Sequence, residues 1–313
     1  MTPRPIVSSA ALATALSAPP AGTTSILTTL FDLVALTKPR LAFFSVLTAA
    51  TAYGSAAVGL GWIHASAMLV GTTCAAAGAL SLNQWWERDL DRLMRRTRSR
   101  PLPRAALSHR VALAWSLALG VSGVALLAVW TTHLAALLAA ATIVLYGFVY
   151  TPLKRRTRWA TEIGAIAGAL PPLLGGAAAG AIASPTAWVL FAVLFFWQMP
   201  HFYAIGWMHR DDYRAARFPL LPAIDESGRR TALWSFGYCL SLLAVSTVPW
   251  AIGLAGPVYG TGALGSGGAM LWCATRFVAS AKHDRDAAAR RLFLASIAGL
   301  PVLLFALLLD RIV

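Results

Sequence analysis

The feature that most constrains this chain is a series of apolar segments, each about as long as a helix that crosses a lipid bilayer. Such a helix needs about 20 mostly apolar residues to span the hydrocarbon core. The backbone polar groups of a segment in lipid must be paired within the protein, which an α-helix achieves on its own. The pattern therefore predicts an all-α integral membrane bundle of about nine transmembrane helices, placed roughly at 41–60, 65–86, 110–130, 134–151, 161–183, 186–207, 231–252, 259–279 and 292–310.

Composition supports a membrane protein and argues against a soluble domain. Of the 313 residues, 58% are hydrophobic and 12% are charged, whereas soluble proteins average about 25% charged residues. The formal net charge of +14 does not indicate nucleic acid as a partner, because the basic residues gather in the connections between apolar segments. Cys74, Cys239 and Cys273 lie inside apolar segments with no CxxC spacing, so we expect neither a disulfide nor a zinc framework.

The basic residues also predict an orientation. Lys and Arg precede the first apolar segment and occupy the 2–3, 4–5, 6–7 and 8–9 connections, whereas the other four connections contain none. By the positive-inside rule, the N-terminus and the basic connections lie in the cytoplasm and the C-terminus lies outside, as in a bacterial inner membrane. Residues 1–35, rich in Ala, Ser, Thr and Pro, are predicted to be a loosely ordered tail, and 36–313 a single transmembrane domain.

A polar stretch at the end of the second predicted helix contains the first candidate site. Asn83, Glu87 and Asp91 are spaced i, i+4 and i+8, so they project from one face of a helix. Amide and carboxylate oxygens suit Mg²⁺, which completes its shell with water and substrate phosphates. Arginines, which bind phosphate groups bidentately, follow at once. We interpret the stretch as a metal-diphosphate site at the membrane surface, with simple anchoring of the helix end as the alternative. These arginines are Arg92, Arg95, Arg96, Arg98 and Arg100.

The connection between the sixth and seventh predicted helices is a second polar region on the same side. It contains His201 near the helix end, and Asp211 and Asp212 further on. If the two regions face each other, their carboxylates and arginines would form a polar chamber that could hold Mg²⁺ and assist the departure of a diphosphate. The alternative is a solvated turn in which the two aspartates pair with Arg210 or Arg214. We retain all three residues as candidate catalytic residues, beside Asn83, Glu87 and Asp91.

These motifs resemble the intramembrane prenyltransferases of the UbiA superfamily and, within it, the protohaem IX farnesyltransferases, or haem O synthases. The resemblance runs from Leu36 to the end of the last predicted helix. The wider superfamily has a second Asp-rich motif at the end of helix 6, whereas this chain has His201 at the first position of that motif, a change that haem O synthases share. The matching pieces are residues 83–103, Tyr150-Thr151-Pro152-Leu153-Lys154-Arg155, Trp197-Gln198-Met199-Pro200-His201-Phe202, and Asp211-Asp212-Tyr213 followed by Pro219-Leu220-Leu221-Pro222.

The resemblance implies a helical bundle around a central cavity, and transfer of the farnesyl group of farnesyl diphosphate to the vinyl group of protohaem IX, giving haem O and diphosphate. It implies that Asn83, Glu87 and Asp91 bind Mg²⁺ and diphosphate. His201 could orient the haem, contact its iron or touch the diphosphate. The basic residues that match the diphosphate clamp of the family are Lys38, Arg92, Arg96, Arg100 and Lys154.

Further partners and properties follow from the same resemblance. Haem is a substrate here and not a resident cofactor, and the lipid bilayer is the environment of the reaction. Haem A synthase and oxidase assembly proteins are candidate protein partners. We also expect aromatic side chains to line the cavity, where they would exclude water and stabilise positive charge. The candidates for this lining are Phe43, Phe44, Trp85, Trp86 and Tyr203.

Three alternatives remain open at this point. Another UbiA-type prenyltransferase with an aromatic acceptor is the nearest, although the missing second Asp-rich motif argues against it. A membrane transporter would show internal repeats and binding residues near the bilayer midplane, whereas the acidic residues here stand at helix ends. A non-catalytic haem-binding membrane protein would not need the stripe formed by Asn83, Glu87 and Asp91.

Overall fold

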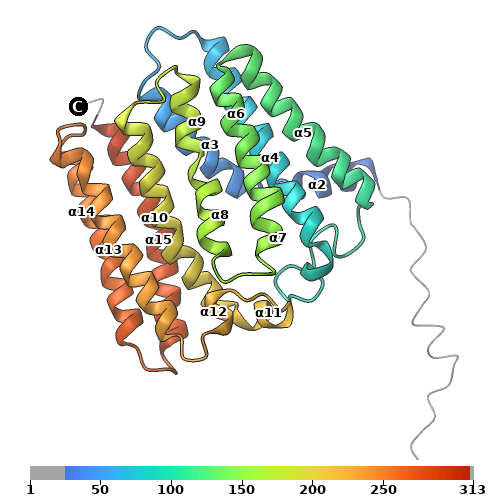
Figure 1. The fold of residues 1–313 in the computed structure, drawn as a ribbon, viewed down its shortest axis with the longest axis vertical. Coiled ribbons are helices and arrows are strands. Elements are labelled where there is room, and N and C mark those ends of the chain that lie inside the picture. Colours follow the sequence, from blue (N-terminus) through green and yellow to red (C-terminus); the bar gives the residue numbers. More distant parts are fainter. Residues whose placement is uncertain (1–24, 311–313) are drawn as a thin grey trace, which may run out of the picture.

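The computed structural model describes residues 25–310, which form a bundle of helices without a single β-strand in that range (Figure 1). The prediction of an all-α protein is therefore confirmed. The helices are α2 (Ile26–Leu36), α3 (Pro39–Gly54), α4 (Trp62–Asp91), α5 (His109–Trp130), α6 (His133–Val144), the π-helix η1 (Leu145–Tyr150), α7 (Thr151–Leu153), α8 (Ala160–Ala169), α9 (Pro171–Ala178), α10 (Pro185–Met208), α11 (Arg210–Ala215), α12 (Leu221–Ile224), α13 (Arg229–Ala251), α14 (Pro257–Ala279) and α15 (Arg285–Leu309).

Six helical stretches of the described chain are long and apolar enough to cross a membrane: Trp62–Asp91, His133–Leu153 and the helices α5, α10, α13 and α15. The other three predicted spans also fall on helices. Of these, α3 has only 16 residues, α8 and α9 are interrupted where Pro171 begins a new helix, and α14 is rich in glycine. A multi-pass membrane protein is confirmed, whereas the count of nine spans is not.

The predicted N-terminal tail overlaps the first described helix. Residues 26–36, most of which we assigned to the tail, form α2, which begins after the capping Ser25. Residues 1–24 of the predicted tail lie outside the described residues. Helix α2 is joined to the bundle by an ion pair between Asp32 and Arg104.

Small residues allow the helices of the first half to approach closely. A Cβ atom on Gly78 of α4 would lie 2.5 Å from the backbone nitrogen of Gly120 on α5, and one on Gly123 would lie 2.4 Å from the nitrogen of Ala75. In lipid, where burial of apolar surface gives little driving force between helices, such close packing is a main source of association. The same holds for Gly175 of α9, whose added Cβ would meet the Ala49 carbonyl of α3.

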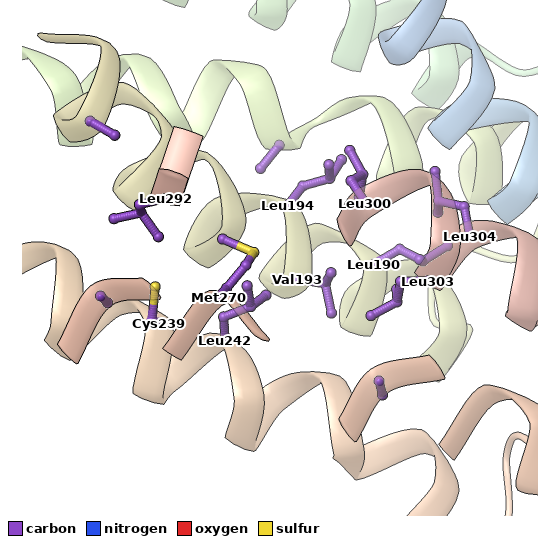
Figure 2. Close-up of a cluster of buried hydrophobic side chains, with 14 of the residues drawn as sticks. Leu190, Val193, Leu194, Cys239, Leu242, Met270, Leu292, Leu300, Leu303 and Leu304 are labelled. Atoms are coloured by element: carbon purple, nitrogen blue, oxygen red, sulfur yellow. The ribbon is translucent and has the colours of Figure 1, made fainter. Parts of the chain in front are cut away.

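The second half is held together by larger apolar side chains. Helices α10, α13, α14 and α15 pack side by side along one edge of the bundle (Figure 1). Cys239 lies within this core as a buried free thiol. The core residues drawn in Figure 2 include Leu190, Val193, Leu194, Leu242, Met270, Leu292, Leu300, Leu303 and Leu304.

Irregular segments gather at the end of the bundle where α4 ends. The short helices α11 and α12 lie at that end together with α7 (Figure 1). There the chain passes from α6 through the π-helix η1 into α7, immediately before Pro152, which lacks a backbone N–H and cannot continue the α-helical ladder. Single π turns within helices often occur at functional sites. This end of the bundle contains the candidate site.

Candidate active site

The predicted stripe on α4 is buried. Asn83, Glu87 and Asp91 are 2%, 5% and 0% exposed, and all three lie on the face of α4 that is turned into the protein. Asp89, two positions before Asp91, has a side chain that is 66% exposed. Asn83, Glu87 and Asp91 therefore share one inward face of α4, as predicted from their spacing, and Asp89 lies on another. Buried carboxylates need partners, because an unpaired charge in the interior is costly.

Each member of the stripe is bound by a different cationic side chain. Lys38 donates to Asn83 Oδ1 at 2.9 Å, and Lys154 donates to Glu87 Oε1 at 3.1 Å. Arg100 donates to Asp91 Oδ2 at 2.7 Å. These three bases come from separate parts of the chain: the α2–α3 junction, the end of α7 and the connection after α4. The structure thus assembles six of the predicted site residues into one cluster.

Local backbone features hold these bases in place. Lys38 is the N-cap of α3 and has a φ of 46°, a left-handed conformation that Pro39 at the next position follows. Thr151, which the sequence analysis did not assign to the site, accepts from Asn83 Nδ2 at 3.1 Å and donates to the Tyr146 carbonyl of η1 at 2.7 Å. The Tyr146 carbonyl therefore accepts from both the backbone N–H and the hydroxyl of Thr151, and Thr151 fixes the amide of Asn83.

The cluster contains an excess of positive charge. With Lys38 protonated, three cations face two carboxylates, so the sum is one positive charge. Burial, with a contribution from the nearby Arg100 and against the attraction of Glu87 and Asp91, lowers the pKa of Lys38 to about 7. Burial also opposes the charge of Lys154, but the Glu87 carboxylate outweighs it and raises the pKa of Lys154 above the ordinary value. A buried cluster with a net positive charge is suited to a multiply charged anion.

Three aromatic rings lie close to the ammonium group of Lys154. Its Nζ lies 4.8 Å from the centroid of Phe218, 5.6 Å from that of Tyr213 and 5.9 Å from that of Tyr150. The negative faces of such rings stabilise an ammonium group. Tyr213 and Phe218 come from the 6–7 connection, so the two polar regions predicted from the sequence do meet at Lys154.

The predicted acidic pair of the 6–7 connection does not join the stripe. Asp212 accepts from the backbone nitrogens of Arg95 and Arg96 at 3.2 and 3.3 Å. Asp211 has a side chain that is 83% exposed and pairs with Arg214 at 3.1 Å, as in the alternative weighed above. The geometry gives Asp212 contacts that fix the connection after α4, and gives Asp211 a solvated ion pair.

Two members of the predicted diphosphate clamp, Arg92 and Arg96, bind partners outside the stripe. Arg92 points outward, where it donates to the Pro103 carbonyl at 3.2 Å and lies 3.9 Å from Asp89. Arg96 donates to the Tyr213 hydroxyl at 3.4 Å. Of the five basic residues proposed for the clamp, the structure brings Lys38, Arg100 and Lys154 to the stripe.

We predict that Asp212→Ala weakens binding of a prenyl diphosphate by about 3- to 10-fold, because two hydrogen bonds to a charged acceptor are lost and the connection that holds Arg100 is loosened. Binding can be measured by isothermal titration with the purified protein. Asp211→Ala is the matched control and should leave the affinity unchanged. Equal effects of the two substitutions would contradict the role of Asp212 in fixing this connection.

A mainly apolar cavity of about 230 Å³ lies beside the stripe. Tyr146 and Tyr150 of η1 line it, and Tyr150 also contacts Lys154, so the cavity and the charged cluster share a wall. This agrees with the predicted central cavity. Its walls come from α3, α4, α6, η1, α8, α9, α10 and α15, with Phe44, Trp197, Gln198, His201 and Phe202 among the lining residues.

The predicted aromatic lining was correct for only one of its five members. Phe44 lines the cavity. Phe43 and Trp86 are 62% and 43% exposed on the outside of the described bundle, and Trp85 donates its ring N–H to the His109 carbonyl. Tyr203 is not among the lining residues and hydrogen-bonds Glu162 of α8. Adjacent positions on a helix point about 100° apart, so aromatic residues next to a site residue need not share its cavity.

His201 lies in the cavity wall and not in the charged cluster. Its Nδ1 lies 2.9 Å from Ser296 Oγ on α15. The ring stacks on Trp197, one helical turn earlier, with centroids 5.2 Å apart, and Phe293 lies 4.9 Å away. The structure therefore separates His201 from Asn83, Glu87 and Asp91, with which the sequence grouped it.

The sequence also matches a known family. The profile of the UbiA prenyltransferase family covers residues 41–297. The chain belongs to this family. Residues 25–310 combine the helical fold of this family with the buried polar stripe on α4.

Individual relatives and solved structures agree with the family. The chain is 45% identical over 281 residues to a protoheme IX farnesyltransferase of Opitutus terrae, covering 90% of this chain and 95% of that protein. It is 39% identical over 290 residues to a protoheme IX farnesyltransferase of Solibacter usitatus, covering 90% and 98%. A UbiA homologue of Aeropyrum pernix has a TM-score of 0.71 at 19% identity, covering 87% and 98%. Another, of Archaeoglobus fulgidus and bound to DMAPP and Mg²⁺, has a TM-score of 0.60 at 14% identity, covering 87% and 99%.

The residues of the stripe fit a hard divalent cation. An amide and two carboxylates offer oxygen ligands of the type that Mg²⁺ prefers, with room for substrate phosphates and water in the shell. Asp91 Oδ1 is buried and has no hydrogen-bond partner among residues 25–310, so one carboxylate oxygen is free to take a ligand. No group of three or more His, Cys, Asp or Glu side chains suited to a metal occurs in the same range. The stripe alone would leave much of the coordination shell to the substrate.

Proposed function

We propose that this chain transfers the farnesyl group of farnesyl diphosphate to the vinyl group of protohaem IX, giving haem O and diphosphate. The observation that carries the proposal is the cluster in which Lys38, Lys154 and Arg100 bind the three residues of the stripe, beside an apolar cavity. A diphosphate attached to an apolar chain needs those two environments next to each other. The names of the relatives, at up to 45% identity, support farnesyl and protohaem as the substrates.

The cationic residues act on the leaving group. When the allylic carbon–oxygen bond breaks, negative charge builds on the diphosphate and positive charge spreads over the allyl group. Lys38, Lys154 and Arg100 are already in place to stabilise that negative charge, without reorganisation during the reaction. The rings of Tyr146 and Tyr150, which line the cavity, can stabilise the allylic cation and keep water from it.

The remaining steps concern the acceptor. The electrons of the vinyl double bond form the new carbon–carbon bond, which leaves a cation on the haem side, and water adds there with loss of a proton to give the hydroxyl group of haem O. Asn83, Glu87 and Asp91 are the residues that would hold Mg²⁺. When bound, that ion supplies additional positive charge at the diphosphate.

The test of this function is a direct assay. Membranes containing the protein are incubated with protohaem, farnesyl diphosphate and Mg²⁺, and the extracted haems are analysed by mass spectrometry. We expect haem O, and we expect it to disappear with EDTA. A prenylated benzoate or naphthoate in place of haem O would assign the chain to another acceptor class, and the lack of any prenyl product would overturn the proposal.

Arg100→Ala should weaken binding of farnesyl diphosphate by about 10- to 100-fold, because a hydrogen bond between two charged groups contributes about 1.5–3 kcal/mol. Binding of protohaem should change little. Separate titrations of the two substrates measure this difference. Arg110→Ala, at an exposed arginine at the start of α5, is the control. Equal losses for both substrates would indicate that Arg100 serves the fold and not the diphosphate.

We also propose that the chain lies in a bacterial inner membrane with the charged cluster facing the cytoplasm. The basic connections support this orientation. Alkaline phosphatase, which is active only outside the cytoplasm, should be active when fused after Val313 and inactive when fused within residues 92–108. The reverse pattern would place the cluster outside and contradict the orientation.

A further inference from the structure

Ser296 and His201 form a pair in the cavity wall whose hydrogen bonds determine where the imidazole carries its proton. Ser296 is fully buried on α15, and its Oγ lies 2.6 Å from the Phe293 carbonyl oxygen and 2.9 Å from His201 Nδ1. The hydroxyl has a single hydrogen for these two neighbours. A carbonyl oxygen cannot donate, so the short contact to Phe293 requires the hydroxyl hydrogen to point there.

The tautomer of His201 follows from this arrangement. Because the hydroxyl donates to Phe293, its oxygen must accept from the ring, so Nδ1 carries the hydrogen. In a neutral imidazole the other nitrogen, Nε2, then has a free lone pair. No hydrogen bond to Nε2 occurs among residues 25–310. Nε2 is also absent from the fully enclosed polar atoms without a partner in that range, so part of its surface is accessible. The accessible nitrogen of a cavity-lining histidine is therefore an acceptor.

The ring is also fixed in orientation. Trp197 stacks on it at 5.2 Å and Phe293 packs on it at 4.9 Å. Trp197 is itself held, since its ring N–H donates to the Ser296 carbonyl at 2.7 Å. A rotation of the imidazole would break the Nδ1 hydrogen bond and disturb both aromatic contacts. Such an arrangement, with Nδ1–H bound to an oxygen and Nε2 free, is the one in which proteins present histidine to a metal.

We propose that His201 Nε2 is the axial ligand to the iron of the tetrapyrrole substrate, and that Ser296 is the positioning residue that sets its tautomer. This inference rests on the proposed function. It excludes one of the three roles considered for His201, because a lone pair cannot donate a hydrogen bond to diphosphate. Iron coordination would anchor the porphyrin in the cavity independently of the diphosphate site, which is formed by Lys38, Arg100 and Lys154.

Spectroscopy of bound haem tests the assignment directly. Ferric protohaem is titrated into the purified full-length protein, and the Soret band and the electron paramagnetic resonance spectrum are recorded. We expect the signature of imidazole-ligated haem in the wild type. In His201→Ala the signature should vanish, the affinity should fall by about tenfold or more, and added imidazole should restore the spectrum. Metal-free protoporphyrin IX should bind the wild type and His201→Ala equally well.

Variants of Ser296 test the positioning role. Ser296→Ala should weaken haem binding by about tenfold, the scale on which loss of an outer partner affects a metal ligand, and should alter the spectrum, whereas Ser296→Thr should keep both close to wild type. Ser235→Ala is the matched control, since Ser235 is equally buried and its hydroxyl donates within its own helix. Retained binding of farnesyl diphosphate shows that each variant is folded.

Two results would overturn the proposal. One is a wild-type protein whose bound haem lacks the imidazole signature, a measurement that needs no variant. The other is an equal loss of affinity for metal-free protoporphyrin and for protohaem in His201→Ala. That result would mean that the imidazole ring only packs against the porphyrin. Neither result touches the function itself, because haem O formation by the wild type is measured separately. If the proposed function were wrong, the spectrum of bound haem would still show imidazole ligation, but no prenylated haem would form.

Discussion

Asp91→Asn should reduce farnesyl transfer by about 100- to 1,000-fold, a loss on the scale of removing one preorganised electrostatic contact in an active site. Asp91 is fully buried, one of its oxygens binds Arg100 and the other is free among the described residues. The amide keeps the shape of the side chain but removes the charge that balances Arg100 and that would attract a divalent cation. The measurement is the rate of haem O formation at saturating Mg²⁺, with the melting temperature of each variant recorded beside it.

The matched control is Asp89→Asn, two residues earlier on the same helix. The Asp89 side chain is 66% exposed and lies 3.6 Å from Arg88 and 3.9 Å from Arg92. Exposed pairs of this kind contribute little, so the rate should stay within about twofold of wild type. If Asp91→Asn retained full activity in a folded protein, the assignment of Asp91 to the metal-diphosphate site would be wrong.

The main features of the fold could be predicted because lipid imposes strong rules on a sequence. Apolar segments of bilayer length led to helices in every predicted range, and helical spacing led to the buried face formed by Asn83, Glu87 and Asp91. Local rules of this kind need no knowledge of the partners across the bundle. They could not give the number of full spans, because the break before Pro171 and the short α3 depend on how these segments pack.

The composition of the site was harder to predict because it depends on contacts between distant segments. Lys38 lies 45 residues from Asn83 in sequence, and Lys154 lies 67 residues from Glu87. Family motifs pointed to these bases, but not to which partner each would take. Thr151 and Ser296 were missed for the same reason. Thr151 at least stands within a motif that was noted, whereas Ser296 is one of many helical serines.

The 6–7 connection illustrates the limit of charge patterns. Asp211 and Asp212 are adjacent and carry the same charge, yet one is solvated and the other fixes two backbone N–H groups across the site. Only the fold of the connection after α4 decides which of the two has a partner. His201 was likewise grouped with the carboxylates because it lies on the same side of the predicted membrane. Its position on α10 instead turns the side chain toward α15 and the cavity.

Lys154→Met should destabilise the protein by about 3–5 kcal/mol, because it leaves the Glu87 carboxylate buried without its main partner. The double variant Lys154→Met/Glu87→Gln should recover most of this loss, since removing both charges of a buried pair is often nearly neutral. Haem O formation should stay lost in both variants, because the cation that faces the diphosphate is absent.

Thermal unfolding of the purified proteins and the rate of transfer are the two measurements. Arg155→Met, at the exposed neighbouring residue, is the control. A single and a double variant of equal stability would mean that Glu87 is compensated by Lys38 instead. The comparison thus separates what the ion pair contributes to stability from what Lys154 contributes to the reaction.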